Sequence, residues 1–321
     1  MRFVAVINSL NRRNLLVPAL ESLVRAVDPK VFEYAVVVFE AGSTDGSREW
    51  LAGFAGQHPE VRLEVVEATG QGDSSFAAGV NAGCEFALKA FPEVEFLFLY
   101  ETDNWISSPD PLIAAMRLLR EEPRLAAVGF TVRRHSGRFC GWGGAFPTVL
   151  SFVLGPHLCM RLGLPRCKVR KRATHGIRWF TADVVFTSPL LIRAPVWRSS
   201  GGFDAGQFPF SDSDFDWAWN VARDGRLLGV IETDAVVHDN LEVSSGWSSM
   251  RVIDFHRSRF RLLRKHRGRG VIAAIPLLFL RHLSEYAILT GLVLLGRRPK
   301  LSLKKRHVLL KSVWAGYESA A

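Results

Sequence analysis

Cysteine is scarce in this sequence, and no two cysteines form a Cys-x-x-Cys pair. The spacing of the four, Cys84, Cys140, Cys159 and Cys167, matches no zinc site, although His157 lies close to one of them. We therefore interpret all four as reduced and as bearing no metal.

Nothing at the start of the sequence resembles a signal peptide. Met1 and Arg2 lead directly into the apolar residues 3–7, which suit a buried strand and are too short for the apolar core of a signal. We therefore expect the protein to start and to remain on the cytoplasmic side of the membrane.

No unbroken apolar run near the C-terminus is long enough to cross a bilayer. Two apolar runs, 271–280 and 286–295, are separated by Arg281, His282 and Glu285, whereas a span needs about 20 consecutive apolar residues. The runs favour an amphipathic hairpin or an interfacial segment, peripheral on the inner face of the cell membrane. The alternative is a helical cap on the core or on a second subunit.

Acidic residues are missing from two long stretches. Residues 251–311 hold 16 Lys and Arg but only Asp254 and Glu285, and no Asp or Glu occurs between 123 and 182, in a chain of net charge +10. Both stretches suit an anionic partner, and 251–311 suits an anionic membrane surface. A nucleic acid is not expected, because no known nucleic-acid module is present and the charge adjoins apolar runs rather than stacking aromatics.

The first half of the chain alternates short β-rich apolar runs with segments of helical period. This pattern predicts an α/β fold with a Rossmann-like, mostly parallel sheet flanked by helices. The expected strands are 3–8, 34–40, 62–67, 95–100 and 125–130, and the expected helices lie near 15–24, 74–91 and 111–120. Ligands of such sheets bind beyond the carboxyl ends of the strands, so the residues there are the candidates for chemistry.

The second half is less regular. Residues 130–178 are rich in Gly, Pro and Arg and are expected to form acceptor-side loops. A helix is predicted from Asp214 to Asp224, with Ser213 as its cap and Gly225 at its end, followed by a strand at 227–231. We expect one domain over 1–245, with a nucleotide-binding half at 1–105 and an acceptor half at 106–245, and a basic helical region at 246–321.

Five motifs occur in order along residues 1–245. They are Asn8-Ser-Leu-Asn-Arg12, Glu40-Ala-Gly-Ser-Thr-Asp-Gly-Ser47 with Phe76-Ala-Ala-Gly-Val-Asn-Ala-Gly83, Glu101-Thr-Asp103, Gly201-Gly-Phe-Asp204 with Ser213-Asp-Phe-Asp-Trp217, and Val236-Val-His238. Together they resemble glycosyltransferase family 2, which has the A-type glycosyltransferase (GT-A) fold, and its bacterial rhamnosyltransferase-like members. The resemblance implies an inverting transfer from a nucleotide diphosphate sugar to a hydroxyl of a saccharide or lipid-linked acceptor, in polysaccharide biosynthesis of the cell envelope.

The resemblance also implies a donor site. The loop at 8–12 would lie along the nucleoside, Glu40 would contact the donor base, and 76–83 would lie beside the nucleotide sugar. Glu40 replaces the usual Asp, and Ser9 replaces the usual Thr. The donor-binding residues implied are Ser9, Asn11, Arg12, Glu40, Ser43, Asp45, Asn81, Glu101 and Thr102.

Two carboxylates directly follow the apolar residues 96–100, at a strand's carboxyl end. Carboxylate oxygens can hold a hard divalent ion, which neutralises the charge that develops as the bond from a diphosphate to a sugar breaks. By the resemblance, Asp103 would bind Mg²⁺ or Mn²⁺, with Glu101 near the ribose or the metal and His238 near the metal or the diphosphate.

A transfer to a hydroxyl needs a general base, because the acceptor loses its proton as its oxygen attacks. The resemblance assigns this role to Asp214, with Asp212 as the rival if the alignment slips. Asp183, Asp216 and Trp217 are further candidates for acceptor binding or support. Carboxylates in the first turn of a helix are also favoured by the helix dipole without any catalytic role.

Two other functions remain open at this point. A nucleotidyltransferase could use a similar sheet and metal, although residues 8–12 lack the glycine density of its usual phosphate loop. A non-catalytic sugar-nucleotide binding protein is suggested by the departures at Glu40, Glu101 and Ser213.

Overall fold

The computed structural model of the chain describes residues 2–68, 74–167, 169–239 and 249–315. These form two compact units. Unit 1 comprises Met1–Ala145, Cys167–Pro209 and Ser213–Glu242, and unit 2 comprises Phe146–Arg166, Phe210–Asp212 and Val243–Ala321. The domain boundary predicted at residue 245 lies outside the described residues, and unit 2 also includes two segments of the predicted acceptor half.

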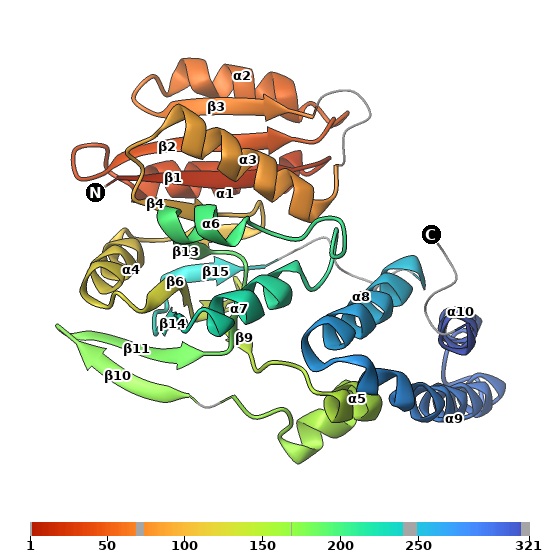
Figure 1. Cartoon of the computed structure of the whole chain (residues 1–321). Helices are drawn as coiled ribbons and strands as arrows, with labels where there is room; N and C mark the ends of the chain where they lie inside the picture. The colour runs from red at the N-terminus through yellow and green to blue at the C-terminus, as the bar shows by residue number, and fades with distance from the viewer. Residues whose placement is uncertain (1, 69–73, 168, 240–248, 316–321) are drawn as a thin grey trace. The chain divides into compact units, whose positions relative to one another are not determined.

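Unit 1 is built on a nine-stranded sheet of order β10-β11-β14-β6-β13-β4-β1-β2-β3 (Figure 1). Strands β3, β2, β1 and β4 are parallel, as predicted, whereas β13 runs antiparallel between β4 and β6. The strands are β1 (Arg2–Ser9), β2 (Glu33–Glu40), β3 (Arg62–Glu67), β4 (Phe96–Leu99), β6 (Leu125–Phe130), β10 (Arg170–Thr174), β11 (Ile177–Ala182), β13 (Leu190–Arg193) and β14 (Leu227–Ile231).

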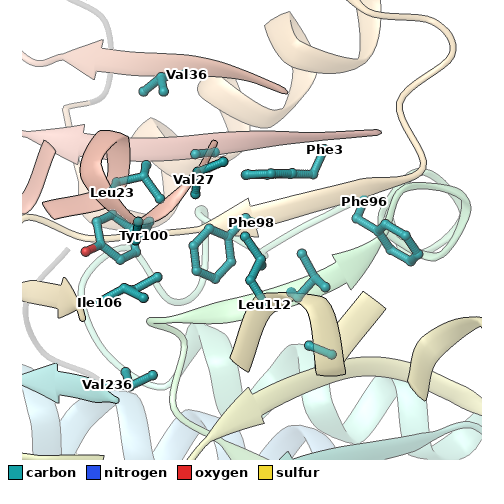
Figure 2. Packing of buried hydrophobic residues seen from close by; sticks show 14 of the residues in the cluster. Phe3, Leu23, Val27, Val36, Phe96, Phe98, Tyr100, Ile106, Leu112 and Val236 are labelled. Atoms are coloured by element: carbon teal, nitrogen blue, oxygen red, sulfur yellow. The ribbon is translucent and has the colours of Figure 1, made fainter. Parts of the chain in front are cut away.

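Helices cover both faces of this sheet. The helices of unit 1 are α1 (Arg13–Ala26), α2 (Ser47–Gln57), α3 (Phe76–Ala90), α4 (Asp110–Glu121), α6 (Ala194–Ser200) and α7 (Ser213–Arg223). Phe3 of β1 and Phe98 of β4 share one buried cluster with Leu23 of α1 and Leu112 of α4 (Figure 2). Helix α3 packs on β1 and β2 from the other face. This packing fixes the carboxyl ends of β1, β2 and β4 at one edge.

Two small sheets complete unit 1. One has the order β5-β15-β7-β8, and the other pairs β12 with β9. Their strands are β5 (Asn104–Ile106), β7 (Val132–Arg133), β8 (Phe139–Gly141), β9 (Gly143–Gly144), β12 (Val184–Val185) and β15 (Val236–His238). The expectation that 130–178 forms only loops is therefore wrong. These strands are too short to show a period of two, so the sequence pattern does not reveal them.

Unit 2 is helical, as predicted for its C-terminal part. It contains α5 (Val149–Leu162), α8 (Ser249–Arg267), the 3₁₀ helix η1 (Arg269–Ala274), α9 (Ile275–Leu294) and α10 (Lys300–Trp314). Helix α9 contacts α10, η1 and α5, and α8 contacts α10 and η1. The helical stretch Arg269–Leu294 is long and apolar enough to cross a membrane, judged by length and composition alone.

Candidate active site

The loops that follow β1 and β2 are tied together by their own side chains. The Asn11 side-chain oxygen accepts a hydrogen bond from the Thr44 amide at 2.7 Å, and the Asn11 amide donates to the Ser43 hydroxyl at 2.8 Å. Asp45 accepts from the Arg13 amide at 2.8 Å. Three of the residues predicted to bind the sugar donor, Asn11, Ser43 and Asp45, therefore hold the two loops together at one edge of the sheet.

Glu40, at the end of β2, is buried and turned into its own loop. Its carboxylate accepts hydrogen bonds from the amides of Ser43 at 2.8 Å and Gly42 at 3.2 Å, and lies 3.5 Å from the Arg48 guanidinium. The adjacent Ser9 hydroxyl is buried and has no hydrogen-bond partner among the described residues. The Glu40 carboxylate is therefore fixed in position before any ligand binds at this edge.

The acidic segment after β4 is held by neighbours on both sides. The Glu101 amide donates to the Ser188 hydroxyl at 2.7 Å. Arg12 Nη1 lies 3.4 Å from the Thr102 hydroxyl and 3.7 Å from Asp103 Oδ2. The structure thus brings the predicted residues Arg12, Glu101, Thr102 and Asp103 together.

Glu101 lies in an acidic surrounding that also includes Asp214. Burial first, and then the negative charges of Asp103 and Asp214, raise the pKa of Glu101 from 4.5 to about 8, while the positive charge of Arg12 opposes the rise. Because such interactions fall off with distance, Asp103 and Asp214 lie near the same carboxyl group although they are far apart in sequence. A region of this kind favours binding of a cation.

His238 enters the same region through the pairing of β15 with β5. It stands opposite Asn104 in that pair, and its Nδ1 lies 3.0 Å from the Asn104 side-chain oxygen and 3.6 Å from Asp103 Oδ1. The Asn104 side-chain nitrogen donates to the Glu101 carbonyl and the Ser188 hydroxyl, so its oxygen faces His238 and accepts from Nδ1–H. When the ring is neutral, a proton on Nδ1 leaves the lone pair on Nε2, as a metal ligand requires.

The donor set fits a divalent cation that is shared with a substrate. Asp103 Oδ1 is buried and accepts no hydrogen bond from the described residues. Within those residues, no three His, Cys, Asp or Glu side chains gather closely enough to hold a metal by themselves. Mg²⁺ commonly binds one or two carboxylates and completes its shell with substrate phosphates and water.

Helix α7 places Asp214 in its first turn and begins at Ser213, which was expected to be the cap. Asp214 is half-buried, whereas Asp216 is buried and lies 3.4 Å from the Asn220 side-chain nitrogen. Trp217 is also buried, and its indole nitrogen donates to the Ser200 hydroxyl at 2.9 Å. Asp216 and Trp217 thus lie in the packed interior of unit 1.

Asp212 belongs to unit 2, where it forms a bidentate ion pair. Arg259 Nη2 lies 2.6 Å from Asp212 Oδ1, and Arg259 Nε lies 3.1 Å from Oδ2. Both groups are largely buried. Since both carboxylate oxygens already accept hydrogen bonds from a guanidinium, Asp212 is poorly suited to remove a proton.

Asn81 and Asp183 are engaged elsewhere in unit 1. The Asn81 side chain donates to the Phe203 carbonyl at 2.8 Å and accepts from the Phe203 amide at 2.9 Å, so it fixes the loop 201–204. Asp183 lies beside Cys167, where burial raises the pKa of the thiol, a hydrogen bond with the Asp183 backbone lowers it, and the charge of Asp183 raises it.

Sequence reasoning missed Asn104 and Ser188. Asn104 directly follows Asp103, so its position could have signalled a supporting role. Ser188 lies far from every motif in the sequence, and only the antiparallel insertion of β13 beside β4 brings it to the acidic segment.

No family model and no curated protein matches this sequence. Solved structures do match. A mannosyltransferase from Pyrobaculum calidifontis, PcManGT, in complex with GDP-Man and Mn²⁺ aligns at TM-score 0.59 with 14% identity, over 100% of this chain and 88% of that chain. The chain has the GT-A fold.

Two further structures with this fold are similar to the chain. S. aureus TarS 1-349 in complex with UDP-GlcNAc aligns at TM-score 0.52 with 14% identity, over 88% of this chain and 73% of that one. GalNAc-T7 with UDP, GalNAc and Mn²⁺ aligns at TM-score 0.57 with 12% identity, over 82% of this chain and 48% of that one. At these identities the likeness concerns the fold.

Proposed function

We propose that the chain is an inverting glycosyltransferase that moves a sugar from a nucleotide diphosphate sugar to a hydroxyl of a saccharide or lipid-linked acceptor. The observation that carries this proposal is the joint action of Asp103 and Asp214 on Glu101 at the carboxyl edge of a GT-A sheet. Some of the solved structures similar to this chain contain GDP-Man, UDP-GlcNAc or UDP.

The donor would lie across the edge formed by the loops after β1, β2 and β4. Hydrogen bonds of Asn11 and Asp45 already hold the loops after β1 and β2 together. These loops therefore lose little conformational entropy when the donor binds. Arg12, next to Asp103, offers a cationic group to the diphosphate.

Asp103, with His238 beside it, would hold Mg²⁺ or Mn²⁺ together with the donor diphosphate. The cation would supply charge neutralisation as the bond between the diphosphate and the sugar breaks. Asn104 would keep His238 in the tautomer that binds a metal. Glu101 would face the ribose or the cation.

Asp214 would act as the general base. It would accept the proton of the acceptor hydroxyl while the acceptor oxygen attacks the anomeric carbon and the nucleotide diphosphate departs. Because the nucleophile displaces the leaving group in a single step, the configuration at the anomeric carbon inverts. Asp216 would support α7 from the interior rather than contact the acceptor.

The experiment that tests the proposal is a thermal-shift panel of nucleotide diphosphate sugars with and without Mn²⁺, followed by transfer assays with the donor that binds. We expect one donor to raise the Tm only when Mn²⁺ is present, and to release its nucleotide diphosphate with an acceptor. Release of pyrophosphate from a nucleoside triphosphate and a sugar phosphate would instead show a nucleotidyltransferase. Binding without transfer or hydrolysis would show a non-catalytic protein.

A further inference from the structure

Unit 2 carries most of the exposed large apolar side chains of this protein. Of the nineteen such side chains among the described residues, fourteen lie in unit 2, which is the smaller of the two units. Monomeric soluble proteins scatter such side chains singly, so this concentration indicates an apolar partner.

Helix α9 contributes the most regular part of this surface. Leu277, Leu280, Ile288 and Leu294 are 54%, 56%, 64% and 82% exposed. Their positions fall within one face of an α-helix, and the other exposed residues on that face are uncharged. Because α9 spans 20 residues, the apolar face is about 30 Å long.

The charged residues of α9 point the other way, into unit 2. Glu285 is bound by Arg281 at 3.1 Å, by His282 at 3.2 Å and by Arg306 of α10 at 2.5 Å. Arg281 Nη1 also donates to the Phe152 carbonyl of α5 at 2.8 Å. The charged residues that interrupt the apolar pattern in the sequence thus pair with one another inside unit 2, and the apolar residues face outward. An ordinary amphipathic helix in water has its polar face outward and its apolar face inward.

A pocket with an apolar floor and a basic rim lies between α9 and α10. Its volume is about 330 Å³. Its lining residues are Leu289, Leu292, Arg298, Ser302, Lys305, Arg306 and Leu309. A phospholipid has the matching chemistry, because its phosphate suits Arg298 and Lys305 while its acyl chain suits the leucines.

The segment that follows α9 carries charge of one sign. Residues 296–311 include Arg297, Arg298, Lys300, Lys304, Lys305, Arg306 and Lys311 and no acidic residue. Apart from Arg306, which is paired with Glu285, each such residue near the membrane strengthens binding to an anionic surface about fivefold. The basic end of α8, at 264–267, adds further positive charge to unit 2.

We propose that unit 2 docks on an anionic phospholipid bilayer, with the exposed face of α9 at the acyl boundary and a lipid phosphate in the pocket between α9 and α10. The helix lies in the interface rather than across the bilayer, because its other side packs on α10, whose basic residues are excluded from hydrocarbon. The proposal does not rest on the proposed function, since its readout is binding and not transfer.

The test is flotation of the full-length protein with vesicles of phosphatidylcholine alone, or of phosphatidylcholine mixed with phosphatidylglycerol. We expect the protein to float with the mixed vesicles, on the order of tenfold or more tighter than with the neutral ones, and to be released by alkaline carbonate. Equal binding to both vesicles, no binding to either, or resistance to carbonate would overturn the proposal.

Matched variants separate the apolar face from general charge. Ile288→Glu should reduce vesicle binding on the order of tenfold, whereas Val31→Glu, at a site 50% exposed in unit 1, adds the same charge and should have little effect. If Ile288→Glu instead abolishes a dimer seen by light scattering and leaves vesicle binding unchanged, a second copy covers this face and the proposal fails.

A second pair of variants tests the pocket. Arg298→Ala with Lys305→Ala removes two basic residues that line it, and Lys300→Ala with Lys304→Ala removes two that do not. We expect the first double variant to lose preference for phosphatidylglycerol severalfold more than the second. Equal losses would show that the pocket takes no lipid phosphate.

Discussion

Asp103 and Asp212 show how differently two buried carboxylates can be placed. Asp103 has one oxygen without a hydrogen bond from the described residues and stands beside a second acid, whereas both oxygens of Asp212 are taken up by Arg259. A carboxylate of the first kind is suited to bind a cation, and one of the second kind to hold a fold together.

The Asp103→Asn variant should therefore lose metal-dependent activity without losing stability. We expect Mn²⁺-stimulated transfer to fall on the order of 100-fold, because an amide oxygen binds a hard cation more weakly and about 3 kcal/mol of leaving-group stabilisation is lost. The Tm should stay the same or rise, since one of the charges that repel Glu101 is removed. Transfer that keeps its wild-type dependence on Mn²⁺ would exclude Asp103 as the ligand.

The Asp212→Asn variant should show the opposite behaviour. Asparagine tolerates the positive φ of 64° at this position, so the substitution removes the charge and leaves the backbone undisturbed. Loss of the partner of the largely buried Arg259 should lower the free energy of unfolding by about 2–3 kcal/mol. Chemical denaturation measures this loss, and kcat below the melting transition should be retained. A large fall in kcat with unchanged stability would instead identify Asp212 as the base.

At the scale of elements, helix α3 is seated on the sheet through its glycines. A Cβ at Gly83 would lie 2.7 Å from Val6 Cγ1, whereas a Cβ at Gly53 of α2 would meet nothing within 4 Å. We expect Gly83→Ala to lower the free energy of unfolding by about 1–3 kcal/mol through overpacking. Gly53→Ala should raise it by about 0.4–1 kcal/mol, because alanine loses less conformational freedom on folding. Urea unfolding of the two variants checks both signs, and destabilisation by both would contradict this account.

The buried histidines of unit 2 make its stability depend on pH. Burial, and then the charge of His282, lower the pKa of His256 from 6.5 to about 3, and burial likewise lowers the pKa of His282. Arg281 and Arg306 lower both values, and Glu285 opposes them. Below pH 6.5 the unfolded chain therefore binds more protons than the folded one. The contribution of the two neutral histidines to the free energy of unfolding is fully present above that pH and is lost as the pH falls toward 3.

We expect the free energy of unfolding to fall between pH 6.5 and 5 with a slope of up to about 1.4 kcal/mol per pH unit for each histidine. Burial raises the pKa of Glu285, but its hydrogen bond to His282 and the charges of Arg281 and Arg306 outweigh burial and lower the pKa from 4.5 to about 2. Glu285 therefore adds to the loss of stability only below about pH 4.5. Urea unfolding at several pH values measures the slope, and His256→Phe should reduce it. An unchanged slope in that variant would show that His256 does not titrate on unfolding.

Most elements that bear the site could be predicted from the sequence. The runs that became β1, β2 and β4 are apolar and end in polar motifs, so the sequence predicts the parallel sheet and places the candidate site at the carboxyl ends of its strands. The predicted strand 95–100 forms at Phe96–Leu99, and the helix that carries Asp214 begins at Ser213.

Other elements carry no periodic signal. Helix α5 was missed because Gly155 and Pro156 interrupt it, with Gly155 in a non-helical conformation at φ 75°. The absence of a Cβ at Gly155 leaves room for the Arg281 guanidinium, which binds the carbonyls of Phe152 and Val153. Contacts between residues so distant in sequence cannot be read from local pattern. The same holds for the partnership of Asp212 with Arg259.

At the scale of the whole molecule, the charge is divided between the two units. The basic stretch 251–311 belongs to unit 2, while the carboxylates of the candidate site belong to unit 1. Such a division suits an enzyme that binds an anionic donor through a cation at one place and an anionic surface at another. It also means that donor binding and membrane binding can be measured separately.

The most direct test of the proposed chemistry compares Asp214→Asn with Asp224→Asn in a transfer assay at saturating donor and Mn²⁺. The two substitutions are chemically identical, but the charge of Asp214 acts on Glu101, whereas Asp224 is exposed just beyond the other end of α7. We predict that Asp214→Asn lowers kcat at least about 100-fold, with an unchanged Kd for the donor, because only the general base is removed. Asp224→Asn should turn over like the wild type. Equal turnover in the two variants would contradict the assignment of Asp214 and, with it, the mechanism proposed for this site.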